Sequence, residues 1–472
     1  METGRILTKA LLFMAAAAVC AGQDLSTDWQ AVLNRIRPDS LRGHLSFLAS
    51  DLLEGRDTPS RGQAVAAEYI ASRFRAAGLE PAGNNGYFHD TAYVAREADL
   101  RDFLLLIRAG GKTYHIRREQ VTVAPGAAME HYGIPAVIVR VSGDGKVPAI
   151  PPGSIVLLSA PPGLNPMQLF AVRQAVRKAS PQLVIALDSR QPVSNVRVAR
   201  PDSNPRETAP ATIHIRQGDV LADAGNWTEA EVSVRLSGFA DRPFAMRNVA
   251  AVLPGSDPDL RDTYVFLSAH YDHIGWLGEG KGDRVYNGAN DDASGTSALL
   301  AIAESAARLA QRPKRTIVFL AVAGEEKGLL GSKEYLRNPT VPAGKIVANI
   351  NMEHLGRTDT AEGDQTRKLN VTGFNFSELT GYVVQAGKRT GVSVTKNEKL
   401  SDPFFRQSDN LAFADKNIPA HTVSSGYLFG DYHGLGDHWD KIDYDHLAAV
   451  TRTIALALLE LADSPVAPKW TR

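Results

Sequence analysis

From residue 248 onward, short hydrophobic runs alternate with segments of helical periodicity. The run at residues 316–322 is almost continuously apolar, as expected of a strand that is buried on both faces. This alternation predicts a parallel α/β sheet, in which ligands lie beyond the carboxyl ends of the strands. The predicted strands are residues 249–253, 264–269, 316–322 and 346–352, and the predicted helices are residues 297–306 and 444–462.

The first 240 residues show other patterns. Residues 26–92 are predicted to form helices and turns, with apolar residues at helical spacing in 41–51 and 64–77 and a C-cap at Gly78. Between about 100 and 240, strand-like runs are separated by Pro- and Gly-rich stretches, which predicts a small β-rich module with its own core. This module has no cluster of His and carboxylates, so we expect it to be accessory. Its predicted elements are strands 103–107, 136–141, 154–158, 183–187 and 231–236 and helix 166–179.

The N-terminus has the pattern of a secretory signal peptide. Arg5 and Lys9 precede an uncharged apolar run at residues 10–19, and small residues follow it. The run is too short to span a bilayer. We therefore predict a signal peptide at residues 1–22 and a secreted or periplasmic protein. Lipid anchoring at Cys20 is the less favoured alternative, because Val19 is a poor residue for the position before a lipidated cysteine.

The composition limits both the macromolecules that the protein can bind and the side chains that can hold a metal ion. Lys plus Arg and Asp plus Glu both number 52, so the formal net charge is zero. We therefore expect neither a nucleic-acid surface nor a polybasic membrane patch. No run outside the leader approaches transmembrane length, so no transmembrane span is predicted. The only cysteine is Cys20, and a mature chain would have no disulfide or thiolate ligand. Any bound metal must be held by His and carboxylates.

Residues that can bind a metal or move a proton follow the predicted strands of the 248–462 region. Because the carboxyl ends of parallel strands meet at one edge of a sheet, we expect these side chains to lie close together. A Gly- and Asn-rich loop before helix 297–306 adds two adjacent carboxylates, which capping of that helix would also explain. The strand-end residues are His270, Glu325, Glu326 and Glu353, His433 lies near the end of the chain, and the loop carries Asp291 and Asp292.

The number and type of these ligands predict two metal ions rather than one. His and carboxylates without thiolate suit zinc, or a borderline metal such as cobalt or manganese. Two His and three carboxylates are too many for one tetrahedral ion, but they fit two ions about 3.5–4 Å apart that share a carboxylate. In the pair Glu325 and Glu326, one carboxylate can bind metal while its neighbour takes a proton from water.

These motifs resemble those of peptidase family M28, a family of zinc aminopeptidases. The resemblance implies a mixed, mostly parallel α/β sheet with helices on both faces (the zinc exopeptidase fold) and an inserted protease-associated (PA) type domain. It gives the division 1–22 signal peptide, 23–99 N-terminal part of the peptidase domain, 100–240 PA-like accessory domain and 241–472 catalytic domain. The motifs are HYD at 270–272, GANDDASG at 288–295, GEEKGLLGS at 324–332, NMEHLGR at 351–357 and YH at 432–433, with weaker matches at 48–56 and 69–74.

The resemblance implies a role for each site residue. His270, Asp291 and Glu353 would hold one zinc, and Asp291, Glu326 and His433 would hold the other, so that Asp291 bridges two Zn²⁺ per chain. Glu325 would be the general base, and Asp272 would orient His270. The peptide bond between Asp291 and Asp292 would be cis.

The chain departs from the family pattern at Glu353, a position where Asp is more usual. His354 is a fallback ligand there, although its side chain should point the other way if the strand continues. Three further histidines, His273, His421 and His438, are surplus to the implied set and are interpreted as structural or pocket-lining.

The function expected from the resemblance is a metallo-exopeptidase acting on peptides, most simply an aminopeptidase that uses a metal-bridging water and a Glu general base. Family members of both kinds share the metal set, so carboxypeptidase action stays open. Two other functions also stay open. One is a glutaminyl cyclase-like enzyme with a single zinc, and the other is a non-catalytic binding protein on the same fold. Counting bound metal ions would separate the first of these from the dinuclear enzyme.

Overall fold

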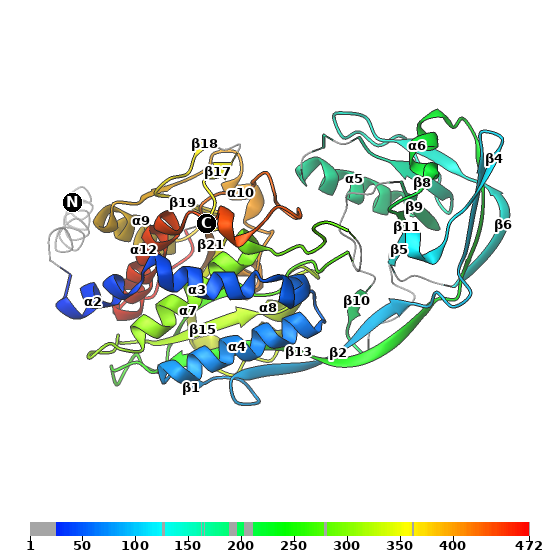
Figure 1. Ribbon diagram of the computed structural model, residues 1–472. Helices are drawn as coiled ribbons and strands as arrows, with labels where there is room; N and C mark the ends of the chain where they lie inside the picture. Colours follow the sequence, from blue (N-terminus) through cyan, green and yellow to red (C-terminus); the bar gives the residue numbers. More distant parts are fainter. Residues whose placement is uncertain are drawn as a thin grey trace, which may run out of the picture.

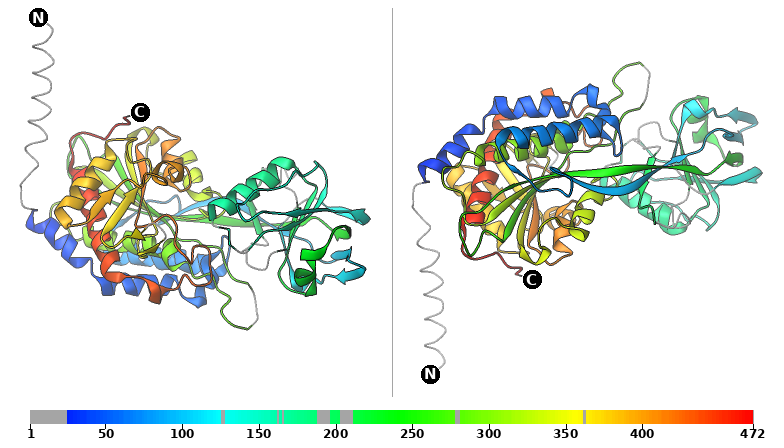
Figure 2. Two further views of the ribbon diagram at one scale, coloured as in Figure 1. Left: turned by 90° about the horizontal axis from the view of Figure 1, so that it is seen from above. Right: turned by 90° about the horizontal axis from the view of Figure 1, so that it is seen from below.

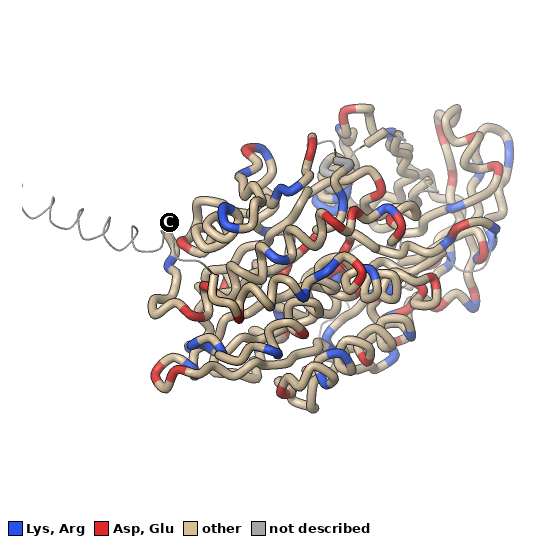
Figure 3. The backbone as a smooth tube through the Cα atoms, turned by 60° about the vertical axis from the view of Figure 1, so that its left-hand side comes forward, with Lys and Arg blue, Asp and Glu red and all other residues tan. Residues whose placement is uncertain are grey.

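The computed structural model describes residues 25–471 except 125–127, 162, 165, 188–195, 203–210, 278–280 and 361–362. These residues form two lobes that are joined by a long ribbon of strands (Figure 1). The predicted signal peptide at 1–22, with Cys20, lies outside the described residues. Among the helices described, none combines the length and the apolar character needed to cross a membrane. Lys and Arg positions are interspersed with Asp and Glu positions over both lobes (Figure 3).

The larger lobe is built on one mixed sheet whose centre is parallel. In this centre β14 pairs in parallel with β15 and β16, and β16 pairs in parallel with β21. The predicted α/β class, a sheet with helices on both faces, is therefore confirmed. The strand order is β10 (Val196–Ala199), β2 (Phe88–Ala98), β13 (Phe239–Leu253), β15 (Thr316–Val322), β14 (Tyr264–His270), β16 (Ile346–Glu353), β21 (Ala420–Ser424), β19 (Lys368–Val371) and β20 (Ser393–Thr395), and β1 (Glu80–Pro81) pairs with β13.

Helices cover both faces of this sheet, and the two-residue period of the strands decides which core each side chain enters. In β15, Ile317, Phe319 and Ala321 pack with one set of helices, whereas Val318 and Leu320 pack on the other side with α8 and α11. The strand is therefore buried on both faces, as its almost continuously apolar sequence predicted. The first face is covered by α2 (Thr27–Arg35), α3 (Pro38–Leu48), α4 (Arg61–Ala77), α7 (Ser294–Ala306), α9 (Leu379–Thr390) and α12 (Tyr444–Asp463), and the second by α8 (Leu330–Arg337) and α11 (Asn410–Ala414).

The helix boundaries follow from local capping. The Ser60 hydroxyl accepts a hydrogen bond from the Gln63 amide at the start of α4, and Gly78 ends that helix in the left-handed region at φ 78°. Asp443 caps α12 in the same way by accepting from the His446 amide. The small elements of this lobe include β17 (Asp359–Thr360), β18 (Gly363–Asp364) and α10 (Ser401–Phe404).

The smaller lobe has two sheets and a core of its own. Its buried apolar residues all come from residues 105–236. One sheet has the order β5 (Val121–Ala124), β11 (Ala211–Ile215), β9 (Leu183–Ala186), β8 (Ile155–Ser159) and β7 (Val137–Arg140), and the other has the order β4 (Lys112–His115), β3 (Leu104–Ala109), β12 (Ala230–Leu236) and β6 (Met129–Pro135). The helices are α5 (Pro166–Ala179), at the residues predicted for it, and α6 (Asp219–Asp223).

An antiparallel ribbon of β2 and β13 carries the smaller lobe away from the helices of the larger one (Figure 2). The two strands stay in register from Phe88 opposite Val249 to Ala98 opposite Phe239. Ion pairs reinforce it across the strands: Arg96 Nε lies 2.8 Å from Asp241 Oδ1. The prediction of helices and turns up to residue 92 is wrong at its end, because β2 begins at Phe88. The polar and charged residues of β2 do not alternate regularly with apolar ones, so its sequence carries no clear strand pattern.

Candidate metal centre

The carboxyl ends of the parallel strands bring the predicted site residues together. His270 is the last residue of β14 and Glu353 is the last residue of β16. The register pairs His270 with Val322, the last residue of β15, so the turn that carries Glu325 and Glu326 begins beside His270. Residues far apart in the sequence therefore meet at one edge of the sheet, as expected for this fold class.

The loop before α7 presents Asp291 to this edge and is held by main-chain hydrogen bonds. The amides of Asn290 and Asp291 donate to the buried carboxylate of Asp437 at 3.0 and 3.1 Å. The Asp292 carboxylate accepts instead from the Gly295 amide at 3.0 Å, so it does not point the same way as Asp291. The peptide bond between Asp291 and Asp292 is cis, as the resemblance implied.

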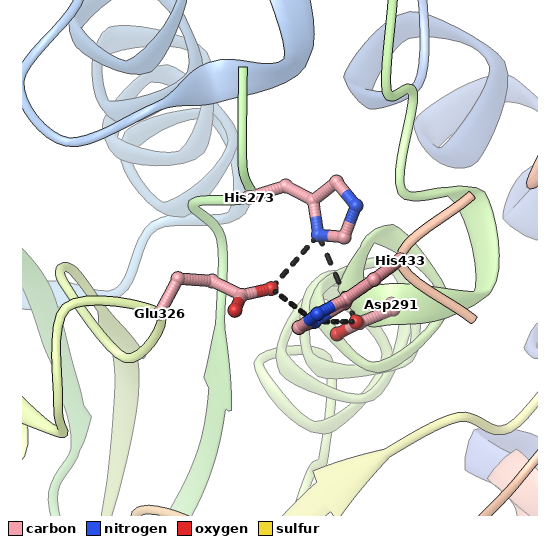
Figure 4. A group of neighbouring side chains, drawn as sticks. All are labelled: His273, Asp291, Glu326 and His433. Carbon is pink, nitrogen blue, oxygen red and sulfur yellow. Dashed lines mark ion pairs between the residues drawn. The ribbon is translucent and has the colours of Figure 1, made fainter. Parts of the chain in front are cut away.

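One oxygen of Asp291 faces two histidines and a glutamate (Figure 4). His433 Nε2 lies 3.1 Å from Asp291 Oδ2 and 3.2 Å from Glu326 Oε1. His273 Nδ1 lies 3.0 Å from Glu326 Oε1 and 3.7 Å from Asp291 Oδ2. The four donor atoms all lie within 4.8 Å of one another. His273, interpreted from the sequence as structural or pocket-lining, thus belongs to this cluster.

The other oxygen of Asp291 faces a second group of side chains. His270 Nε2 lies 3.3 Å from Asp291 Oδ1 and 3.9 Å from Glu353 Oε1. His354 Nε2 lies 3.5 Å from the same Oδ1. The expectation that His354 points the other way held only for a strand that continues past Glu353, and this condition is not met. Strand β16 ends at Glu353, and His354 turns into the left-handed region at φ 51°.

The donor set fits a metal ion. His273 Nδ1, Asp291 Oδ2 and Glu326 Oε1 are buried, and none of them has a hydrogen-bond partner among the described residues. Buried polar atoms without partners are rare and need an explanation. Ligand distances of 2.0–2.2 Å around a tetrahedral ion place neighbouring donors about 3.4 Å apart. The separations of 3.0–3.7 Å in this cluster match that spacing.

Gly288 makes room for His273 within this cluster. A Cβ atom at Gly288 would lie 2.5 Å from the His273 ring and 2.2 Å from the Asp291 carbonyl oxygen. The residue also has φ 58°, which glycine adopts without the cost that other residues incur. The glycine of the GANDDASG motif therefore allows the ring and the Asp291 loop to pack directly against each other.

Asp272 and Glu325 are linked through the main chain. The Glu325 amide donates to Asp272 Oδ1 at 3.2 Å, and Thr58 Oγ1 donates to Asp272 Oδ2 at 3.0 Å. His270 Nδ1 lies 3.2 Å from the backbone oxygen of Asp272 and 3.9 Å from its carboxylate. The nearer acceptor for His270 is thus the main chain of Asp272. Burial raises the pKa of Asp272 to about 6.

The Glu325 carboxyl group has an environment that favours its protonated form. Burial raises its pKa well above the ordinary value, and the charges of Glu353, Glu326 and Asp409 act in the same direction, whereas His270 opposes them. A carboxylate of raised pKa at the edge of a metal-binding cluster can accept and return a proton near neutral pH.

Arg56 is a buried cation that donates hydrogen bonds to main-chain carbonyls in several loops of the site. No role was assigned to it from the sequence. Its Nε donates to the Tyr271 carbonyl at 2.8 Å, and its terminal nitrogens donate to the carbonyls of Asn287 at 2.7 Å and Gly288 at 3.1 Å, as well as to Leu48. Burial lowers its pKa to about 10. The motif at 48–56 pointed to this residue, but nothing in the sequence showed which carbonyls it would bind.

The other two surplus histidines lie outside the cluster. His421 is buried, and its Nε2 lies 2.6 Å from Ser377 Oγ while its Nδ1 lies 2.6 Å from the Thr372 carbonyl. Burial lowers its pKa to about 4, so the ring is neutral. His438 Nε2 lies 3.0 Å from Asp283 Oδ2 near the surface. For these two, the structural interpretation agrees with their contacts.

Comparison with known proteins gives one family and several relatives. The model of peptidase family M28 matches residues 248–458. A probable zinc metalloprotease of Pyricularia oryzae is 29% identical over 291 residues, which cover 52% of this chain and 56% of that protein. Aminopeptidase Y of Saccharomyces cerevisiae is 29% identical over 231 residues, covering 46% of this chain and 39% of that protein.

A solved structure supports the fold over nearly the whole chain. The peptidase M28 precursor from Shewanella amazonensis superposes with a TM-score of 0.62 at 19% identity, covering 93% of this chain and 97% of that one. The chain spans about half the length of the first curated relatives it matches, between 50% and 59%.

Proposed function

We propose, from the match of the peptidase family M28 model to residues 248–458, that the chain is a zinc metallopeptidase with two zinc ions, and that it removes N-terminal residues from peptides. One observation carries the dinuclear part of this proposal. The two oxygens of Asp291 face different donors, with His270 on Oδ1 and His433 on Oδ2. A single carboxylate placed between two sets of donors is the arrangement of a bridging ligand.

The proposed ligands follow from this division. His270 and Glu353 would hold one zinc on the Oδ1 side, and Glu326 and His433 would hold the other on the Oδ2 side. His273 is the added donor that the cluster contributes to the second set. Two zinc ions here would polarise the scissile carbonyl and lower the pKa of the attacking water.

Glu325 is the proposed general base. It follows β15 directly beside Glu326, and the hydrogen bond of its amide to Asp272 fixes the start of the turn. Glu325 would take a proton from the attacking water and later give it to the leaving amine. Its raised pKa supports the second step, because a larger fraction of such a carboxyl group is protonated near neutral pH and has a proton to give.

The variant Glu325→Gln tests this role. Glutamine keeps the size of the side chain but cannot accept a proton, so kcat should fall by about 10²–10⁴ while both zinc ions stay bound. KM should change little if the lost interaction belongs to the transition state. Turnover of aminoacyl-chromophore substrates and zinc content are measured together, with Glu119→Gln on the smaller lobe as the control. Near-normal turnover with two zinc ions would remove Glu325 from the mechanism.

Two separate sets of donors on Asp291 favour the dinuclear enzyme over a cyclase-like enzyme with one zinc. The complete set of ligands and the orphaned buried donors also favour a metal-binding enzyme over a non-catalytic binding protein. Zinc analysis of the purified wild-type protein separates the three. Two ions per chain support the proposal, one ion supports the cyclase, and none supports the binding protein.

We also propose that the smaller lobe is an accessory domain of the PA type and that the protein is exported after cleavage near residue 22. The absence of a His and carboxylate cluster in the described part of the lobe supports the first proposal, and the N-terminal sequence pattern supports the second. N-terminal sequencing of the protein from its native host tests export. A mature chain that still begins at Met1 would contradict it.

A further inference from the structure

Glu353 and His354 are neighbours in sequence, yet both side chains face the metal cluster. In a continuing strand they would point to opposite faces of the sheet. The strand instead ends at Glu353, and His354 adopts φ 51°, a conformation that only a few per cent of residues other than glycine adopt. Such a conformation persists where the surroundings hold it in place, commonly at functional sites.

The distance between His354 and Asp291 fits two ligands of one ion better than a hydrogen bond. His354 Nε2 lies 3.5 Å from Asp291 Oδ1. A hydrogen bond between nitrogen and oxygen spans 2.7–3.2 Å, whereas two ligands of a tetrahedral ion lie about 3.4 Å apart. His270 Nε2, an expected ligand, lies at a similar 3.3 Å from the same oxygen.

The ring and backbone of His354 are fixed before any ion binds. The rings of Phe429 and Tyr432 both contact it edge-on, with centroid distances of 5.4 Å. Its amide donates to Asp292 Oδ1 at 3.3 Å, and its carbonyl accepts from the Ser425 amide at 3.2 Å. A side chain held from several directions loses little freedom when it binds, so an imidazole held in this way is preorganised as a ligand.

We propose that His354 is a ligand of the zinc ion held by His270 and Glu353. Each oxygen of Asp291 would then serve a set of the same composition, two histidines and one glutamate. The Oδ1 set is His270, His354 and Glu353, and the Oδ2 set is His433, His273 and Glu326. This inference rests on the proposed function. It departs from the ligand set that the resemblance to family M28 implies, because in that set Glu353 binds zinc and His354 does not.

The experiment compares zinc affinities of the full-length protein and its variants by competition with a chromophoric chelator. The wild-type protein should bind two ions, and His354→Ala should weaken one of the two zinc-binding steps by at least about 10–100-fold. That range is the loss of metal affinity caused by removing a residue that supports a ligand, and loss of a ligand itself should cost no less. Glu353→Ala should weaken the same step, and His433→Ala the other. His131→Ala, in the smaller lobe, is the matched control and should leave both steps unchanged.

A second variant and a spectrum separate a ligand from a hydrogen-bond donor. His354→Gln keeps a donor near Asp291 but is a poor zinc ligand, so it should lose affinity as His354→Ala does and should change the visible absorption of the Co²⁺-substituted protein. Wild-type affinity and an unchanged Co²⁺ spectrum in His354→Gln would overturn the inference and leave the proposed function intact. A wild-type protein that binds no zinc would overturn both.

Discussion

The two lobes of the molecule bury polar groups in opposite ways. Between residues 100 and 240, Thr122 is the only buried polar or charged residue among those described, and the rest of that core is apolar. In the larger lobe, carboxylates, histidines and Arg56 are buried together at the carboxyl ends of the parallel strands. Burying a charge is costly unless it is paired or bound to a metal. The described core of the smaller lobe thus buries no charged side chain, whereas the larger lobe buries a cluster of charges whose cost a bound metal would offset.

Removal of zinc should have the largest effect, and it should be confined to the larger lobe. Chelation should abolish peptidase activity. It should also lower the free energy of unfolding of this lobe by about 4 kcal/mol relative to a sample in which the free zinc concentration is 1,000 times Kd. Hydrogen exchange of peptides from each lobe, with and without chelator, measures the difference. Zinc added back should restore activity. Equal loss of protection in peptides from β3 to β12 would break the contrast between the lobes.

Arg56→Met should have the next largest effect. The substitution leaves four buried carbonyl groups without their donor and removes a buried cation close to Asp272, so unfolding should be easier by about 3–5 kcal/mol. The denaturant midpoint measures this, and zinc content shows whether the loops still hold the cluster.

Arg118→Met in the smaller lobe is the control for Arg56→Met. Arg118 is exposed and pairs only with its neighbour Glu119 in the contacts observed, so the variant should unfold at the wild-type midpoint. Equal midpoints for the two variants would show that Arg56 does not support the site.

Ile185→Val in the smaller lobe should have the smallest effect. Ile185 is fully buried in β9, and the loss of one methylene should cost about 0.5–1.5 kcal/mol. Zinc affinity and kcat should stay at wild-type values, because Ile185 lies in a separate core. A tenfold fall in kcat would show that packing in the smaller lobe affects the metal centre in the larger lobe. It would contradict the interpretation that the two lobes are energetically separate.

Much of the fold could be predicted because the hydrophobic pattern is strong where the sheet is buried. Residues 316–322 form β15 as expected, and residues 166–179 form α5. The pattern fails for β2, whose outer half lies in the ribbon between the lobes. There a strand is stabilised by pairing and by ion pairs such as Arg96 with Asp241, and neither leaves a periodic apolar signal.

The site could be predicted to the level of residue type and strand end, but not to the level of side-chain direction. His270, Glu353 and the Glu325–Glu326 turn lie where parallel strands end, and the topology of a parallel sheet places ligand-binding residues there. The direction of His354 depended on whether the strand continued, and the sequence did not show that it ends at Glu353, because the left-handed φ of His354 is held by contacts with Phe429, Tyr432 and Ser425 from distant parts of the chain. His273 was missed for a similar reason, since its place in the cluster depends on the space left by Gly288.

The ribbon of β2 and β13 restricts how the distance between the lobes can change during evolution. Deleting one residue from either strand would turn every following side chain to the opposite face, so that Arg96 would no longer meet Asp241. Where no β-bulge absorbs the change, only the loss or gain of residues in pairs, matched in both strands, preserves the two faces of the ribbon. The spacing between the lobes is therefore quantised, with a step of about 7 Å, the rise of two residues in an antiparallel strand.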